Sequence, residues 1–168
     1  MSSLPSIQEF NQLEIDDKFK IVDQLFESCD TLKDYIKDTL TKNFQSYKQL
    51  IEIVRILLLS LVNSKDETRV NKIIAAHPRL GEPKVNLSEH SSNEQRSIDD
   101  PETVAKLREL NDKYEATFPG LRYVVFVNGR NRNEIINNME YRIKRNNIEQ
   151  EKIDAIESIC DIAIDRLK

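Results

Sequence analysis

The stretch Ile53-Val-Arg-Ile-Leu-Leu-Leu-Ser-Leu-Val62 is the longest apolar run in the sequence. It is too short to cross a bilayer, which takes about 20 apolar residues, and Arg55 interrupts it. We therefore predict a buried helix from about Phe44 to Leu61, against which the other elements pack. The 168 residues include only three glycines and five prolines. This scarcity favours long uninterrupted helices and argues against hairpin-rich β folds.

Helix start and stop signals recur on both sides of this run. Ser6-Ile-Gln-Glu9 and Ser64-Lys-Asp-Glu67 both have the pattern of a capping box, and Asp100-Pro101 is a strong helix start. A helix should end near Ala76, because the residue before Pro78 is disfavoured in the α region. Apolar residues at helical spacing predict further helices near residues 19–26, 31–40, 131–146 and 148–167, the second capped by Asp30 or Thr31, with a short helix starting at Ser91.

Two stretches lack helical periodicity. The loop at about residues 78–90 contains Gly81 and Pro83, and an irregular loop of this kind is a typical place for function. The apolar run at about residues 123–127 ends at Asn128-Gly129, and we expect it to be an extended buried segment without sheet partners. The sequence thus predicts an all-α fold, a single domain over residues 1–168 forming one compact bundle of eight or nine helices.

Charge and cysteine content exclude several classes of protein. Lys and Arg total 25 and Asp and Glu total 29, which gives a net charge of −4 and no basic tract. Nucleic-acid binding, including a helix-turn-helix regulator, is therefore disfavoured, since phosphate contacts supply most of that affinity. The first ten residues lack the pattern of a signal peptide, and we predict no membrane segment. Cys29 and Cys160 have no metal-like spacing and are expected to be reduced thiols.

His77 is the main candidate for chemistry from the residues alone, because it lies where a helix opens into the irregular loop. A histidine at a helix end also has a simpler role, since its cation suits the negative end of the helix dipole. A metal site from His77, Glu82 and His90 lacks any recognised ligand spacing, so we predict none. Ser91-x-x-Glu94 followed by Gln95 has the form of a capping box, and a helix N-terminus can also bind an anion.

Arg130 and Arg166, taken by themselves, are expected to be exposed arginines. The sequence contains no phosphate-binding glycine loop and no nucleophile elbow. On residue pattern alone, the prediction therefore stops at a helical domain with a candidate His/Glu/Gln site around residues 77–95.

Several motifs taken in order carry a resemblance to a known family. His77-Pro-Arg-Leu-Gly81 is followed by Ser91-Ser-Asn-Glu-Gln95, and then by Tyr123-Val-Val-Phe-Val-Asn-Gly-Arg130 and the terminal Arg166-Leu167. In this order they resemble the OHCU decarboxylases, which act on 2-oxo-4-hydroxy-4-carboxy-5-ureidoimidazoline (OHCU) in urate degradation. The resemblance extends from about Ser6 to Leu167. The family's phenylalanine-rich entry to the apolar segment is here Leu121-Arg122-Tyr123.

The resemblance implies an all-α enzyme, a carboxy-lyase without metal or organic cofactor, that converts OHCU to (S)-allantoin with loss of CO2. It also implies a small anionic substrate and a homodimer. Carried over by position, the family's catalytic histidine falls on His77, and Glu94 would orient this histidine or the substrate hydroxyl. The implied substrate-binding residues are Pro78, Ser91, Gln95, Tyr123, Val124, Val125, Phe126, Val127 and Arg166.

Two alternatives remain beside this function. The same fold could act on a related ureido or imidazole compound, because a motif does not determine the substrate. A non-enzymatic helical domain that binds a protein partner would instead expose a large apolar patch and lack a polar pocket at His77. The chain ends in Arg166-Leu167-Lys168 rather than a Ser-Lys-Leu address, which favours the cytoplasm over the peroxisome.

Overall fold

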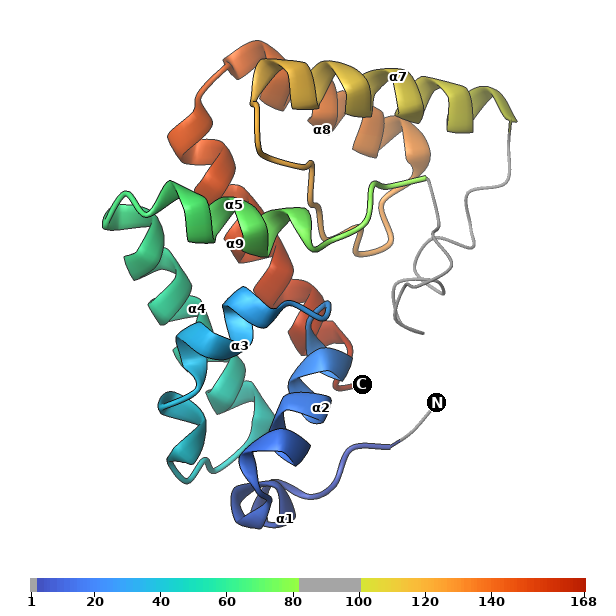
Figure 1. The fold of residues 1–168 in the computed structure, drawn as a ribbon. Coiled ribbons are helices and arrows are strands. Elements are labelled where there is room, and N and C mark those ends of the chain that lie inside the picture. The colour runs from blue at the N-terminus through green and yellow to red at the C-terminus, as the bar shows by residue number, and fades with distance from the viewer. Residues whose placement is uncertain (1–2, 82–100) are drawn as a thin grey trace.

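The computed structural model describes residues 3–81 and 101–168. These two ranges contain eight α-helices, one 3-10 turn and no strand, which confirms the predicted all-α class. The elements, labelled as in Figure 1, are α1 (Ile7–Gln12), α2 (Ile15–Leu25), α3 (Asp30–Ile36), η1 (Thr39–Thr41), α4 (Tyr47–Asn63), α5 (Glu67–Ala75), α7 (Pro101–Thr117), α8 (Arg132–Arg145) and α9 (Ile148–Asp165).

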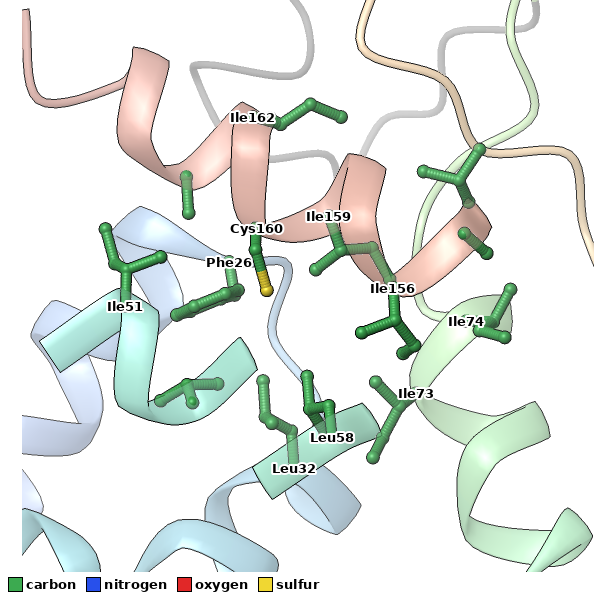
Figure 2. Packing of buried hydrophobic residues seen from close by; sticks show 14 of the residues in the cluster. Phe26, Leu32, Ile51, Leu58, Ile73, Ile74, Ile156, Ile159, Cys160 and Ile162 are labelled. Carbon is green, nitrogen blue, oxygen red and sulfur yellow. The ribbon is translucent and has the colours of Figure 1, made fainter. Parts of the chain in front are cut away.

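The predicted buried helix is α4, and it packs along α9 to form the main seam of the core. Figure 2 shows Ile156, Ile159 and Cys160 of α9 directed toward Ile51 and Leu58 of α4. The buried residues of both helices recur every three or four positions, so each helix presents one apolar stripe to the other. Helix α5 packs against α3, α4 and α9. Figure 1 shows α9 running through the middle of the molecule.

The polar edge of this seam is an arginine surrounded by carboxylates. Arg55 on α4 donates to Glu157 Oε1 at 2.6 Å and to Asp161 Oδ1 at 2.8 Å, both on α9. The charge that interrupts the apolar run is therefore paired at the edge of the helix interface. Helix α4 starts at Tyr47 rather than near Phe44, because Ser46 caps it by accepting from the Gln49 amide.

The capping predictions had mixed outcomes. The Ser6–Glu9 capping box is present at α1, with both reciprocal hydrogen bonds. The predicted box at Ser64–Glu67 is wrong. Ser64 instead ends α4, its Oγ donating to the Leu61 carbonyl at 2.7 Å, and Lys65 turns the chain with φ of 64°. Asp66 then caps α5 by accepting from the Arg69 amide at 3.1 Å.

The third predicted helix is shorter than expected. Helix α3 ends at Ile36, and Leu40 lies in the separate turn η1. Neither Asp30 nor Thr31 is its N-cap, because Cys29 occupies that position without a side-chain capping bond. Cys29 is half-buried, Cys160 is buried and both are free thiols.

Helices α7 and α8 pack against each other at one end of the molecule (Figure 1). Between them, the described chain from Leu121 to Val127 has no regular structure, which confirms the predicted extended segment. Gly120 at its start has φ of 89°, and a Cβ there would lie 2.7 Å from Nδ2 of Asn71 on α5. The positive φ favours glycine at this position, and a side chain here would also require the Asn71 amide to move.

Helix α5 ends at Ala75, close to the end predicted from Pro78. The His77 amide still donates to the Ile74 carbonyl at 3.2 Å, so the turn persists as far as the histidine. No helix within the described ranges is long and apolar enough to span a membrane.

Candidate active site

A pocket of about 280 Å³ lies where the end of α5 meets the extended segment and the end of α9. His77 and Pro78 form one wall, and the chain from Tyr123 to Gly129 forms another. Ile162 and Asp165 from α9, together with Leu80, complete the described lining. Because the end of a helix and an irregular segment both expose backbone groups, such a pocket offers main-chain donors and acceptors as well as apolar side chains.

The His77 side chain is buried and electrostatically held neutral. The residue is 6% exposed. Burial, as the largest cause, and the positive charges of Arg166 and Arg122 together lower the pKa of His77 from 6.5 to about 3. The Ile73 carbonyl acts against this shift, although neither imidazole nitrogen makes a hydrogen bond of acceptable geometry with any described residue. At neutral pH the imidazole is therefore uncharged.

The opposite wall of the pocket is held by arginines that bind its carbonyl groups. Arg142 Nη1 donates to the Val124 carbonyl at 3.2 Å. Arg130 Nη2 donates to the Phe126 carbonyl at 2.6 Å, and its Nε donates to the Val127 carbonyl at 3.2 Å. Arg130, expected to be a plain exposed arginine, is thus half-buried and holds the pocket wall.

Behind this wall lies a buried polar network centred on Glu151. Its carboxylate accepts from the Tyr114 hydroxyl at 2.7 Å, from Arg142 Nε at 2.8 Å and from Arg145 Nη2 at 2.6 Å. The Arg142 guanidinium also lies over the Tyr123 ring, 4.7 Å from its centroid. The network joins α7, α8 and α9 to the first residues of the extended segment.

Sequence reasoning assigned no role to this network, although a signal was present. Ile135, Met139 and Arg142 follow one another at helical spacing and are all buried on α8. A charged residue that continues an apolar stripe indicates a buried ion, which then requires a partner. On α9, the charged residue Glu151 likewise lies in the buried stripe, four positions before Ala155.

Arg166 is buried rather than exposed, which corrects the expectation from its sequence position. It is 8% exposed and lies directly after α9. Its Nη1 donates to the Leu25 carbonyl at 2.9 Å, and its Nη2 pairs with Glu27 Oε1 at 3.1 Å. The guanidinium is close enough to act on the pKa of His77, but Arg166 is not part of the described pocket lining.

The pocket thus brings together seven of the predicted site residues from two distant parts of the chain. These are His77, Pro78, Tyr123, Val124, Val125, Phe126 and Val127. Ser91, Glu94 and Gln95 lie outside the described residues, as do Glu82 and His90 of the rejected metal site. Within the described residues, no three His, Cys, Asp or Glu side chains are grouped as a metal site would require.

Asp165 is a pocket residue without any sequence signal. Its carboxylate pairs with Lys168 at 3.1 Å, and both side chains are largely solvated. A carboxylate at this position can accept hydrogen bonds from N–H groups of a ligand.

These features define the class of protein as one with a concave small-molecule site. A mixed apolar and polar pocket with one strongly perturbed titratable group is typical of enzyme active sites. The partner-binding alternative predicted the opposite. Within the described ranges, the exposed large apolar side chains come from three different helices, namely Ile56, Tyr141 and Ile148.

The comparison with family models identifies the family. The model of the OHCU decarboxylases matches residues 11–168, so the chain belongs to the OHCU decarboxylase family, whose members are carboxy-lyases. The comparison with curated proteins found no match.

The fold is also similar to a solved structure described as the crystal structure of (S)-allantoin synthase. The TM-score is 0.68 at 16% sequence identity, and the match covers 97% of this chain and 53% of that one. This chain therefore spans about half the length of that protein. At this identity the similarity supports the fold.

Proposed function

We propose that this chain decarboxylates OHCU to (S)-allantoin with His77 as the proton-transferring group. The observation that carries the proposal is a neutral, buried imidazole in the pocket, without a hydrogen-bond partner among the described residues. A buried polar group without a partner is costly, so its retention in a pocket favours a ligand as the missing partner. Family membership supports decarboxylation as the reaction class.

The chemistry requires one bond to break, one proton to be taken up from solvent and a second proton to change place. When the carbon–carboxylate bond of OHCU breaks, CO2 leaves and the bonding electron pair forms a C=C bond to the ureido-bearing carbon. The electron pair of the ring C=N moves onto the ring nitrogen, which takes up a proton from solvent, and the product of this step is an enol. The enol hydroxyl must then lose a proton, and the carbon bearing the ureido group must gain one on a single face. A neutral imidazole can accept the first proton and return one to the carbon, so no net proton is consumed at His77.

The pocket wall would orient the substrate for this step. The carbonyls of Val124, Phe126 and Val127 are occupied by arginines. No described residue accepts a hydrogen bond from the Val124, Val125 or Phe126 amides, so these donors remain for ring or ureido oxygens. We propose that Ser91, Glu94 and Gln95 complete the site, with Glu94 orienting His77 or the substrate hydroxyl. Holding the reacting groups in one geometry is itself a large part of catalysis.

We propose that Arg166 binds the anionic substrate, as its family position implies. Its guanidinium pairs with Glu27 and is not among the described lining residues of the pocket. Its positive charge also lowers the pKa of His77. The homodimer and the cytoplasmic location remain predictions from the sequence.

The test is a coupled assay on a folded His77→Asn variant. Urate, urate oxidase and hydroxyisourate hydrolase generate OHCU in place, and circular dichroism at the allantoin band follows the chiral product. Positioned proton transfer contributes on the order of 10²- to 10⁴-fold in rate, so His77→Asn should lose activity by about that factor. Far-ultraviolet circular dichroism and thermal melting show whether the variant is folded.

Two outcomes would contradict the proposal. One is a folded His77→Asn variant that still makes (S)-allantoin at the wild-type rate. The other is a wild-type rate no faster than spontaneous OHCU decay. In the second case, a panel of related ureido and imidazole carboxylates would test the alternative substrate class.

A further inference from the structure

Arg122 links the two walls of the pocket directly. It lies one residue before the segment that lines the pocket, at the departure from the family's phenylalanine-rich entry. Its Nη1 donates to the His77 carbonyl at 2.8 Å and to the Ala75 carbonyl at 3.1 Å. These carbonyls belong to the end of α5, where the last groups of a helix have no partner within the helix. One guanidinium thus satisfies the helix end and holds the histidine backbone.

The neighbouring residues keep this contact in place. Gly120, two residues earlier, approaches Asn71 on α5 so closely that a Cβ would lie 2.7 Å from its Nδ2. Tyr123, one residue later, donates from its hydroxyl to Asn138 Oδ1 at 2.5 Å and lies under Arg142. Arg122 therefore lies next to a residue whose side chain is held by Asn138 and Arg142.

The charge of Arg122 acts on the same histidine. The charged or titratable groups that face His77 from the described elements are Arg166 and Asp165 at the end of α9, and Arg122 and Tyr123 on the extended segment. After burial and Arg166, Arg122 is the third cause that lowers the pKa of His77. Its contribution is that of a nearby like charge, which disfavours the imidazolium.

We propose that Arg122 is a positioning residue for the reaction, because it ties the His77 backbone to the segment that carries the substrate-binding amides. The proposal rests on the proposed function, and it assigns to this residue the fixed distance between the proton-transferring group and the donors on the facing wall. Arg122 does not line the described pocket, so it acts through His77.

The kinetic constants kcat and KM should distinguish a positioning role of Arg122 from a role in substrate binding. A loss of the link leaves the amides of the extended segment in place but lets the imidazole move, so kcat should fall while KM changes little. A displacement of about 1 Å can cost about 10²-fold in rate. We therefore expect a 10- to 100-fold lower kcat and a KM within about threefold of wild type for Arg122→Met.

The experiment compares Arg122→Met, Arg122→Lys and the control Arg69→Met in the full chain. Lys keeps the positive charge but cannot present the planar fork, so Arg122→Lys should recover the wild-type pKa of His77 while recovering only part of kcat. NMR of the histidine side chains, assigned with a His90→Asn variant, follows the imidazole titration. In Arg122→Met the His77 pKa should rise, because a nearby like charge is lost.

Arg69 is a matched control because it is an arginine on α5 itself, paired with Asp66 away from the pocket. Arg69→Met should leave kcat, KM and the His77 titration unchanged. Thermal melting of all variants identifies any loss of kcat that comes from unfolding. If Arg122→Met does not fold, Arg122→Lys is the variant that tests the proposal.

The proposal is overturned if folded Arg122→Met keeps kcat within twofold of wild type, or if its loss lies in KM alone. An unchanged His77 titration in that variant also contradicts it. Failure of the proposed function looks different, since the wild type would then not decarboxylate OHCU while the NMR titration would still report the link between Arg122 and His77.

Discussion

The α4–α9 seam and the wall of the pocket are stabilised in opposite ways. The seam is an apolar interface with a charged contact, Arg55 with Glu157 and Asp161, at its edge. The pocket wall is an irregular segment whose carbonyls are held by Arg130 and Arg142, with Glu151 buried behind it. Arg122 of this segment holds the carbonyls at the end of α5. Apolar packing is strong but non-directional. Buried ion pairs add little net stability, yet they place their partners accurately when every group is satisfied.

This contrast explains why costly ions lie next to the site. A backbone segment without sheet partners has no ladder to define its position, so side-chain donors must do so. Helices α4 and α9 need no such help, because interlocking side chains define their distance. The predicted consequence is that the seam determines stability and the arginines determine pocket geometry.

The sharpest test compares the loss of stability in Glu151→Gln with that in Glu157→Gln. Both glutamates lie on α9 and pair with arginines. Glu151 is 0% exposed and the Glu157 side chain is 44% exposed. Removing the Glu151 charge leaves the buried Arg142 with Asp154 Oδ2, 4.0 Å from its Nε, as its remaining carboxylate partner among the described residues. The free energy of unfolding should therefore fall by about 3–5 kcal/mol. Glu157→Gln should cost about 1 kcal/mol or less. Urea denaturation measures both, and equal costs would break the comparison.

A truncation in the seam should affect stability alone. Leu58 is 0% exposed on α4 and is not among the residues that line the described pocket. Leu58→Ala should lower the free energy of unfolding by about 2–5 kcal/mol through lost burial and a cavity. Well below its melting temperature, the folded variant should keep the wild-type kcat and KM for OHCU. The exposed neighbour Ile56→Ala is the control and should change stability by about 0.5 kcal/mol or less.

A third test is the pH dependence of stability that comes from His77. Its pKa is about 3 in the folded protein against 6.5 ordinarily. Between these values the unfolded chain binds the proton and the folded chain does not, so stability falls as pH falls from about 6.5 toward 3. The slope from one such group is at most about 1.4 kcal/mol per pH unit. Subtracting the profile of His77→Asn isolates it, and parallel profiles would contradict the assigned burial effect.

Local signals in the sequence predicted most of the fold. The apolar run at residues 53–62, the box at Ser6 and the break before Pro78 each depend on neighbouring residues alone, and each is present. The Ser64 box failed because Lys65 adopts a left-handed conformation and shifts the cap to Asp66. That choice depends on how α4 and α5 pack, which short patterns do not contain.

Local sequence patterns likewise predict some residues of the candidate site and not others. His77 and the segment 123–127 could be predicted from motifs because each is a contiguous pattern. The roles of Arg122, Arg142 and Glu151 could not, since they arise from contacts between residues 9 to 45 positions apart that lie on separate elements. Arg166 was expected at the surface because a position near the end of the chain says nothing about Glu27, its partner on the far side of the sequence.

The buried thiol of Cys160 has a practical consequence. It sits in the α4–α9 seam, directed into the core (Figure 2), and burial raises its pKa to about 12. Thiolate is the reactive form, so alkylating reagents should modify this sulfur only when the seam opens. Half-buried Cys29 lies at the start of α3, outside the α4–α9 interface. The rate at which Cys160 is alkylated therefore reports how often the α4–α9 seam opens. Mass spectrometry of the intact chain measures this rate without an introduced label.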